Sequence, residues 1–373
     1  MSARTNTLHL LNARLPDGGL WTLSLRDGVI AARTPAADTT AVDGPGLDLA
    51  GALVLAAPVD GHVHLDKTLW GGPWLAHEAG ASVRDRIECE RRMRAEVRPP
   101  VAERAEILLR RLMAAGTTAL RTHADVDDAI GLAHVEMLLG LRERFAADVT
   151  LQIVAFPQSG VVSRPGVAAL LDAAVAAGAD LVGGLDPKSI DGDAAGQLDA
   201  IFAIAQRRAV GIDIHLHDAD PGGNEQLRDI AARTQAAGLG GKVTVSHAFS
   251  LGTPDRQDFE RTAAALARAG VSILTSAPGA APMPPVKALL DAGVSVFAGS
   301  DNIRDTWSPL GSGDMLDRAM LVAWRQGFRR DADLALAYDL CSGRAAKAMG
   351  LPPRGVAVGD GADLIVVDAD SLG

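Results

Sequence analysis

The chain is poor in aromatic residues, in cysteine and in long apolar runs. Aromatic residues make up only 3% of its 373 residues, so a core has to be built from Ala, Val, Leu and Ile. The two cysteines, Cys89 and Cys341, lie far apart and form no CxxC motif, so neither a disulfide framework nor a thiolate zinc site is implied. No apolar run reaches the roughly 18 residues of a membrane span, and the N-terminus has no apolar signal segment. We therefore expect a cytoplasmic protein without a membrane segment.

Positive charge is scarce as well. Lys and Arg number 36 against 46 Asp and Glu, a formal net charge of −10. Because binding to phosphates requires a basic surface, this balance argues against a nucleic-acid partner. A hydrophobic fraction of 48% and a charged fraction of 22% are typical of a globular protein. The length allows one large domain and a smaller one.

One pattern repeats along most of the chain: a short apolar run, a polar residue at its end, and then a helical segment. The helical segments 100–116, 166–178, 224–238 and 256–270 are amphipathic and end at glycine, the usual residue after a helix. Eight such β-then-α units predict an α/β fold of the TIM barrel type, (β/α)8. A doubly wound open sheet is the alternative, but no GxGxxG follows the first strand. The eight apolar runs are 52–64, 117–125, 150–158, 180–188, 210–218, 242–250, 271–278 and 294–301.

The two ends of the chain have a different sequence pattern. Residues 1–57 are short alternating stretches broken by glycine turns, and the final segment is strand-like. Neither end is long enough to bury a core alone. We predict that 1–57 and 350–373 form one small β-sandwich domain beside a barrel of residues 58–349. Residues 82–97 form an extra charged helix, which we expect to face solvent or, as part of the connection after the first barrel strand, to cover the pocket.

Histidines gather where the predicted strands end. His62 and His64, in "HVH", are two residues apart and therefore share one face of a strand. Active sites of TIM barrels lie at the C-terminal ends of the strands, so these side chains should converge. Three imidazoles and a carboxylate suit Zn²⁺ or another first-row divalent ion, which would lower the pKa of a bound water toward about 7. The other polar residues at predicted strand ends are His123, Gln158, Asp186, Lys188, His215, His217, His247 and Asp301.

Several motifs resemble those of the amidohydrolase superfamily, and within it the cytosine deaminase branch. The resemblance extends over essentially the whole chain and includes the terminal β-domain, whose "VGDGADLIVVD" ending is typical of the superfamily. The segments that carry it, in order, are "HVHLDKT", "LRTHADVDDA", "LQIVAFPQSG", "VTVSHAFSLG" and "SDNIRDTWSPLGSGDML".

The resemblance implies a role for each matching residue. A single metal ion would be held by His62, His64, His215 and Asp301. His247 would position the hydrolytic water or stabilise the tetrahedral intermediate, and Asp301 would also take the proton of the nucleophile. Gln158 would bond a substrate amide or ring nitrogen, and Trp307 would pack near the ring.

The chain also departs from cytosine deaminase. His217 stands where that enzyme has an Asp, Asp218 stands where it has the proton-shuttling Glu, and Asn302 replaces a second Asp. The combination "HLDK", "GGLDP" and "HLHD" resembles the isopropylammelide aminohydrolases, which remove an amine from an s-triazine ring. That likeness would add Lys67, Asp186 and His217 to the pocket. Either His217 or Asp218 would be the proton shuttle.

These observations predict a hydrolase that removes ammonia or an amine from a small nitrogen heterocycle, with one Zn²⁺ or Fe²⁺ per subunit and Mn²⁺ as a third candidate. The alternative is a binuclear cyclic amidase in which a carboxylated Lys188 bridges two metals. A non-enzymatic relative is a third reading. For His123 we weigh a buried imidazole bonded to the backbone against a direct catalytic role. The resemblance also implies a homo-oligomer.

Overall fold

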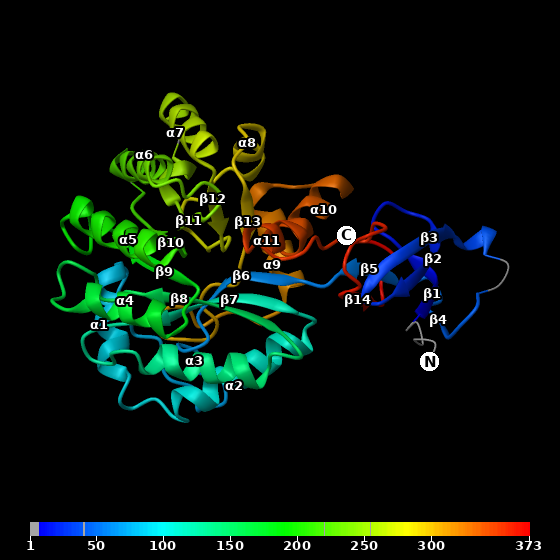
Figure 1. Ribbon diagram of the computed structural model, residues 1–373, viewed down its shortest axis with the longest axis horizontal. Coiled ribbons are helices and arrows are strands. Elements are labelled where there is room, and N and C mark those ends of the chain that lie inside the picture. Colours follow the sequence, from blue (N-terminus) through cyan, green and yellow to red (C-terminus); the bar gives the residue numbers. More distant parts are fainter. Residues whose placement is uncertain (1–6, 40–41, 220, 254) are drawn as a thin grey trace.

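The computed structural model describes residues 7–39, 42–219, 221–253 and 255–373. Within these ranges the strands form an eight-stranded sheet and a six-stranded sheet. Helices surround the larger sheet, and the smaller sheet lies to one side together with both chain ends (Figure 1). None of the helices described has the length and hydropathy to span a membrane.

The larger sheet is the predicted barrel. Its strands pair in chain order and run parallel. Every residue of β7 and β11 is buried. This is expected of barrel strands, because one face packs in the barrel interior and helices cover the other face. The ring closes where the backbone N–H of Asp301 donates to the carbonyl of His62 at 2.7 Å. The strands are β6 (Val59–Val63), β7 (Ala119–Asp125), β8 (Thr150–Phe156), β9 (Leu181–Leu185), β10 (Gly211–Leu216), β11 (Val243–His247), β12 (Val271–Thr275) and β13 (Val296–Ala298).

The helices between these strands pack their apolar side chains against the barrel. Glycines end several of them as predicted; Gly178 and Gly270, for example, are the C-cap residues of their helices, with φ angles of 122° and 66°. Two 3₁₀ turns cover Ala36–Asp38 and Phe249–Gly252. The helices are α1 (Val83–Met93), α2 (Val101–Ala114), α3 (Ala133–Arg144), α4 (Val167–Ala177), α5 (Ala194–Arg208), α6 (Pro221–Ala236), α7 (Arg256–Ala269), α8 (Val286–Asp291), α9 (Met315–Gln326), α10 (Asp331–Leu340) and α11 (Gly343–Ala348).

The smaller sheet joins the two ends of the chain, as predicted. Strand β14 (Leu364–Val367) pairs antiparallel with β5 (Leu53–Ala56), and the order continues through β1, β2 and β3, with β4 beside β1. This sheet has its own core, which includes Leu10, Leu23 and Val54. Residues 1–6, 40 and 41 of the predicted domain lie outside the described residues, and its boundaries at 57/58 and 349/350 stay a prediction. The other strands are β1 (Thr7–Arg14), β2 (Leu20–Arg26), β3 (Val29–Pro35) and β4 (Gly46–Asp48).

The apolar run 52–64, predicted as one strand, is divided between the two sheets. Its first part is β5 of the small sheet and its second part is β6 of the barrel. At the division, the N–H of Ala57 donates to Asp363 in the small domain, whereas the N–H of Val59 donates to Cys341 beside the barrel. Pro58, which has no N–H to donate, separates these two bonds. The prediction of a single strand was therefore wrong. Both halves are apolar and buried, so the apolar pattern alone does not distinguish them.

Two glycines allow the barrel to close tightly beside His62. A Cβ on Gly299 would lie 2.5 Å from the backbone nitrogen of His62, and one on Gly61 would lie 2.5 Å from the Phe297 ring. In contrast, a Cβ on Gly140 in α3 would meet no atom within 4 Å. A Gly-to-Ala change should therefore lower the stability of the fold at Gly61 or Gly299 and raise it at Gly140.

We predict that Gly299→Ala lowers the free energy of unfolding by about 1–3 kcal/mol, the usual cost of overpacking. Gly140→Ala is the matched control and should raise it by about 0.5–1 kcal/mol, because alanine is the better helix former. Urea unfolding followed by circular dichroism measures both values. Equal stability of Gly299→Ala and the wild type would contradict the tight closure.

Candidate active site and metal centre

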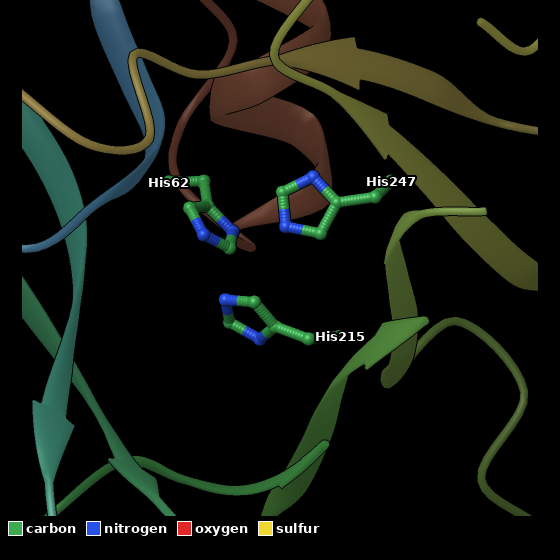
Figure 2. Close-up of side chains that lie close together, drawn as sticks. All are labelled: His62, His215 and His247. Atoms are coloured by element: carbon green, nitrogen blue, oxygen red, sulfur yellow. The ribbon is translucent and has the colours of Figure 1, made fainter. Parts of the chain in front are cut away.

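The barrel brings the predicted histidines together at the C-terminal ends of its strands. Figure 2 shows His62 from β6, His215 from β10 and His247 from β11 with their rings pointing toward one another. Their ring nitrogens can reach a common ion, and all three side chains are buried. His64 follows β6 directly, and Asp301 lies three residues after β13. The expected convergence is thus present.

Three distances among the four residues predicted as metal ligands are those that a metal ion requires. Oδ1 of Asp301 is 3.6 Å from Nε2 of His62 and 3.5 Å from Nε2 of His64. Nε2 of His64 is 3.4 Å from Nε2 of His215. Ligand atoms about 2.1 Å from a tetrahedral ion lie about 3.4 Å from one another. Nε2 of His62 is also buried without a hydrogen-bond partner, so the donor set fits a divalent cation.

The electrostatics favour the protonation states that bind a metal. Burial, together with the neighbouring imidazoles, holds the pKa of His215 well below its usual value, so the ring is neutral. Burial raises the pKa of Asp301, but His247, His62 and His64 lower it more, and the net pKa lies well below the ordinary value. Neutral imidazoles and an ionised carboxylate are the forms in which these groups coordinate metals.

A chain of hydrogen bonds orients His62 from behind. Its Nδ1 lies 3.0 Å from Oγ of Ser246, and that hydroxyl donates to Oδ1 of Asp213 at 2.7 Å. Since the hydroxyl hydrogen is used on Asp213, Oγ accepts from Nδ1–H of His62, which leaves Nε2 unprotonated and facing Asp301. The other oxygen of Asp213 accepts from Arg121 at 2.9 Å. Neither Ser246 nor Asp213 was predicted from the sequence. Ser246 directly precedes His247, and Asp213 lies two residues before His215.

Three candidate residues adopt a backbone conformation that L-residues rarely take. Asp186, His247 and Asp301 have φ angles of 35°, 74° and 62°. Each follows or ends a barrel strand, where the chain turns sharply toward the barrel mouth. Such strain persists where the surrounding structure imposes it and is frequent at functional sites.

A small cavity of about 20 Å³ lies beside the candidate ligands. Three predicted ligands, His64, His215 and Asp301, line it, so the cavity and the candidate metal centre form one site. Gln158 is buried with its Nε2 unbonded, and Asn302 donates to Asp305 at 2.6 Å. Burial raises the pKa of Asp305 to about 7. The remaining lining residues are Lys67, Phe156, Gln158, Leu185, His217, Asn302 and Trp307.

Asp186 holds His217 rather than lining the cavity. Its carboxylate accepts from the backbone N–H of His217 at 2.5 Å and lies 2.8 Å from Nδ1 of that ring. Burial lowers the pKa of His217, but the charge and hydrogen bond of Asp186 raise it more, so the net pKa is raised. The His217 ring also stacks on His247, with centroids 4.5 Å apart.

Asp218, the other candidate proton shuttle, has a different position. Its carboxylate accepts a hydrogen bond from Nε2 of Gln226 in α6 at 2.9 Å. Asp218 is absent from the residues that line the small cavity, whereas His217 is among them.

Lys67 lies at the cavity but is held by two carboxylates. Its Nζ donates to Glu90 at 3.0 and 3.1 Å and to Asp125 at 2.8 Å. Burial lowers the pKa of Lys67, but these carboxylates raise it above the ordinary value. Glu90 belongs to α1, the charged helix expected to face solvent. For Glu90 that expectation was wrong, because the side chain is buried among Lys67, Trp307 and Asp125.

One predicted role of His123 and one predicted role of Lys188 do not agree with the structure. His123 is buried with neither ring nitrogen hydrogen-bonded, so the expected bond to the backbone is absent; its ring instead packs against His62, with centroids 3.9 Å apart. Lys188 is exposed in the segment after β9. A lysine that bridges two metals would have to lie in the buried cluster.

Comparison with known proteins gives matches over nearly the whole chain. The crystal structure of N-isopropylammelide isopropylaminohydrolase from Burkholderia multivorans ATCC 17616 is 44% identical, with a TM-score of 0.92 over 98% of this chain and 93% of that one. The crystal structure of 5-methylcytosine deaminase from Klebsiella pneumoniae, liganded with phosphonocytosine, is 28% identical, with a TM-score of 0.85 over 98% and 92% of the two chains.

A third relative is the uncharacterized protein YahJ of Escherichia coli (strain K12), which is 40% identical over 288 residues. That match covers 75% of this chain but only 61% of YahJ, so the chain spans less than two thirds of this relative. The sequence profile of the amidohydrolase family matches residues 46–372. The resemblance seen in the motifs is thereby confirmed: the chain belongs to the amidohydrolase family.

Proposed function

We propose that this protein hydrolyses an exocyclic carbon–nitrogen bond of a small nitrogen heterocycle and releases ammonia or an amine. The observation that carries the proposal is the meeting of His64, His215, His217 and Asp301 around one small cavity, with His62 and His247 close to them. The activities named for the two similar structures, on an isopropylammelide and on 5-methylcytosine, support this substrate class.

One divalent ion would be held by His62, His64, His215 and Asp301, whose donor atoms have the spacing described above. Zn²⁺ and Fe²⁺ suit this donor set, with Mn²⁺ as a third candidate. Such an ion supplies Lewis-acid charge and lowers the pKa of water. The chain's own residues then have to handle the protons and hold the ring.

Asp301 and His247 would act at the attacking water. One carboxylate oxygen of Asp301 faces the imidazoles of His62 and His64, and the other lies 3.9 Å from Nδ1 of His247. This second oxygen would take the proton of the water. Both nitrogens of His247 lack a hydrogen-bond partner, so the ring is available to stabilise the negative charge that develops on the substrate.

His217 would deliver the proton to the leaving nitrogen. It lines the cavity, whereas Asp218 bonds to Gln226 and does not. Asp186 acts through His217 as a positioning residue, because it fixes both the backbone and Nδ1 of His217 and leaves Nε2 for the substrate. The sequence left both shuttles open, and this geometry supports His217.

Four further residues would hold the ring. The unbonded amide nitrogen of Gln158 can donate to a ring carbonyl, and Trp307 would pack against the ring. Asn302 is oriented by Asp305. Lys67 would place its ammonium beside a ring oxygen while Glu90 and Asp125 balance its charge.

The binuclear cyclic amidase is not favoured. The two similar structures named above are of an aminohydrolase and a deaminase, and Lys188 is exposed. A location in the cytoplasm and a homo-oligomeric assembly follow from the sequence and the resemblance, and both stay predictions.

The test of the proposed function combines metal content with amine release. We expect about one metal ion per chain by plasma mass spectrometry, as the proposed four-ligand site implies, and release of ammonia or amine from a panel of cytosine, isocytosine, creatinine, ammelide and N-alkyl ammelides. His215→Asn should lose the metal, whereas His77→Asn, at an exposed histidine outside the cluster, should retain it. About two metals with activity only on hydantoin or dihydroorotate would contradict the proposal.

The choice of proton shuttle has its own test. His217→Asn should lower kcat by about 10²- to 10⁴-fold, the usual contribution of a general acid, with the metal content unchanged. Asp218→Asn is the control and should keep kcat within the same order of magnitude. Steady-state kinetics on the best substrate of the panel measure both variants. A larger loss for Asp218→Asn than for His217→Asn would reverse the assignment.

A further inference from the structure

Glu90 is an unusual residue for its helix. Helix α1 begins at a capping box in which Ser82 and Asp85 bond each other's backbone N–H groups, and most of its charged side chains are accessible. Glu90 is only 9% exposed. A buried glutamate is rare unless it is paired, so its partners indicate what it does.

Two of the partners of Glu90 are side chains of the candidate active site, and Arg94 of the same segment forms an ion pair with it at 3.7 Å. Its carboxylate accepts from Nζ of Lys67 at 3.0 Å and from Nε1 of Trp307 at 2.6 Å. Both Lys67 and Trp307 line the small cavity beside the candidate metal ligands. Lys67 follows β6 and Trp307 follows β13, so one carboxylate ties together the two ends of the barrel sheet above the site.

Helix α1 does not depend on Glu90 to stay in place. Arg91 donates to Asp127 at 2.9 Å, and Arg94 donates to the same carboxylate at 3.1 Å. Arg84 donates to the carbonyls of Ser189 and Ile190 at 3.2 and 3.3 Å. These contacts join the helix to two loops of the barrel, after β7 and after β9. The effect of a substitution at Glu90 on the pocket can therefore be distinguished from the effect of losing helix α1.

A second cavity lies on the other side of Lys67. It measures about 490 Å³, and both Lys67 and Glu90 line it. Since Lys67 also lines the cavity of about 20 Å³ at the metal ligands, this lysine lies between the two spaces, with Glu90 on the side of the larger one. About 20 Å³ accommodates little more than one water molecule, which is less than a six-membered ring needs. A ring therefore needs more room than the small cavity offers, and Lys67 is a part of its wall with a second cavity behind it.

We propose that Glu90 is a positioning residue that sets the size of the substrate pocket. Its carboxylate holds Lys67 and Trp307 as one wall, and the wall yields toward the second cavity when a ring enters. This inference rests on the proposed function, because it concerns which heterocycles the site accepts. Removing the carboxylate should weaken the binding of a compact ring and reduce the discrimination against rings with bulky substituents.

The test compares Glu90→Ala and Glu90→Gln with the wild type on one compact and one bulky N-alkyl heterocycle. Loss of a charge-assisted hydrogen bond corresponds to about 10- to 100-fold, so we expect Glu90→Ala to lower kcat/KM for the compact ring by that factor, mainly through KM. Discrimination against the bulky ring should fall about as much. Glu90→Gln keeps the volume and one acceptor, and its effect should be smaller.

Glu88→Ala and Glu88→Gln are the matched controls, since Glu88 lies on the same helix with an exposed side chain. They should behave as the wild type. A structural readout accompanies the kinetics: in protein labelled with 5-fluorotryptophan, the ¹⁹F resonance of Trp307, assigned with Trp307→Phe, should shift in both Glu90 variants and in neither control.

The outcomes separate the two proposals. If the wild type releases no amine from any heterocycle, the proposed function fails, while the ¹⁹F shift still tests whether Glu90 holds Trp307. If the wild type is active and a folded Glu90 variant keeps its KM, its discrimination and its Trp307 resonance, the positioning role is wrong. Should Glu90→Ala not fold, the nearly isosteric Glu90→Gln decides by the same three readouts.

Discussion

The closure of the barrel between β6 and β13 is the constraint on which the whole site depends. One backbone hydrogen bond, from Asp301 to His62, holds the end of the last strand segment against the first strand. Gly61 and Gly299 make this approach feasible, because a Cβ at either position would collide with its neighbour. The spacing of the candidate metal donors is therefore set by packed strands and by the short segments directly after them, and packed strands hold such distances more firmly than loops do.

The polar groups around this junction show where ligands belong. Buried polar atoms normally find a hydrogen-bond partner, and the supporting side chains do: Ser246 and Asp213 behind His62, and Asp186 behind His217. Several of the atoms left without one belong to residues that meet the metal or the substrate in the proposed mechanism, including Nε2 of His62, both nitrogens of His247 and Nε2 of Gln158. Metal and substrate would satisfy groups that the protein leaves open.

Local patterns predicted the barrel strands and their terminal histidines, because a buried parallel strand is an apolar run with its functional residue at the C-terminal end. They did not predict the division of residues 52–64, where both halves are apolar and only long-range pairing distinguishes β5 from β6. Nor did they place Asp186 behind His217, which depends on the register that pairs Leu185 with His215. Glu90 has the charged pattern of a solvent-facing helix, and its burial arises from partners distant in sequence.

The central claim is that one metal ion is held by His62, His64, His215 and Asp301. X-ray diffraction from crystals of the metal-loaded protein, recorded on both sides of the absorption edge of the bound metal, tests it most directly. The account predicts one anomalous peak per chain, about 2.1 Å from the three imidazole nitrogens and from a carboxylate oxygen of Asp301. Two peaks bridged by Lys188, or a single peak away from His64 and Asp301, would contradict it.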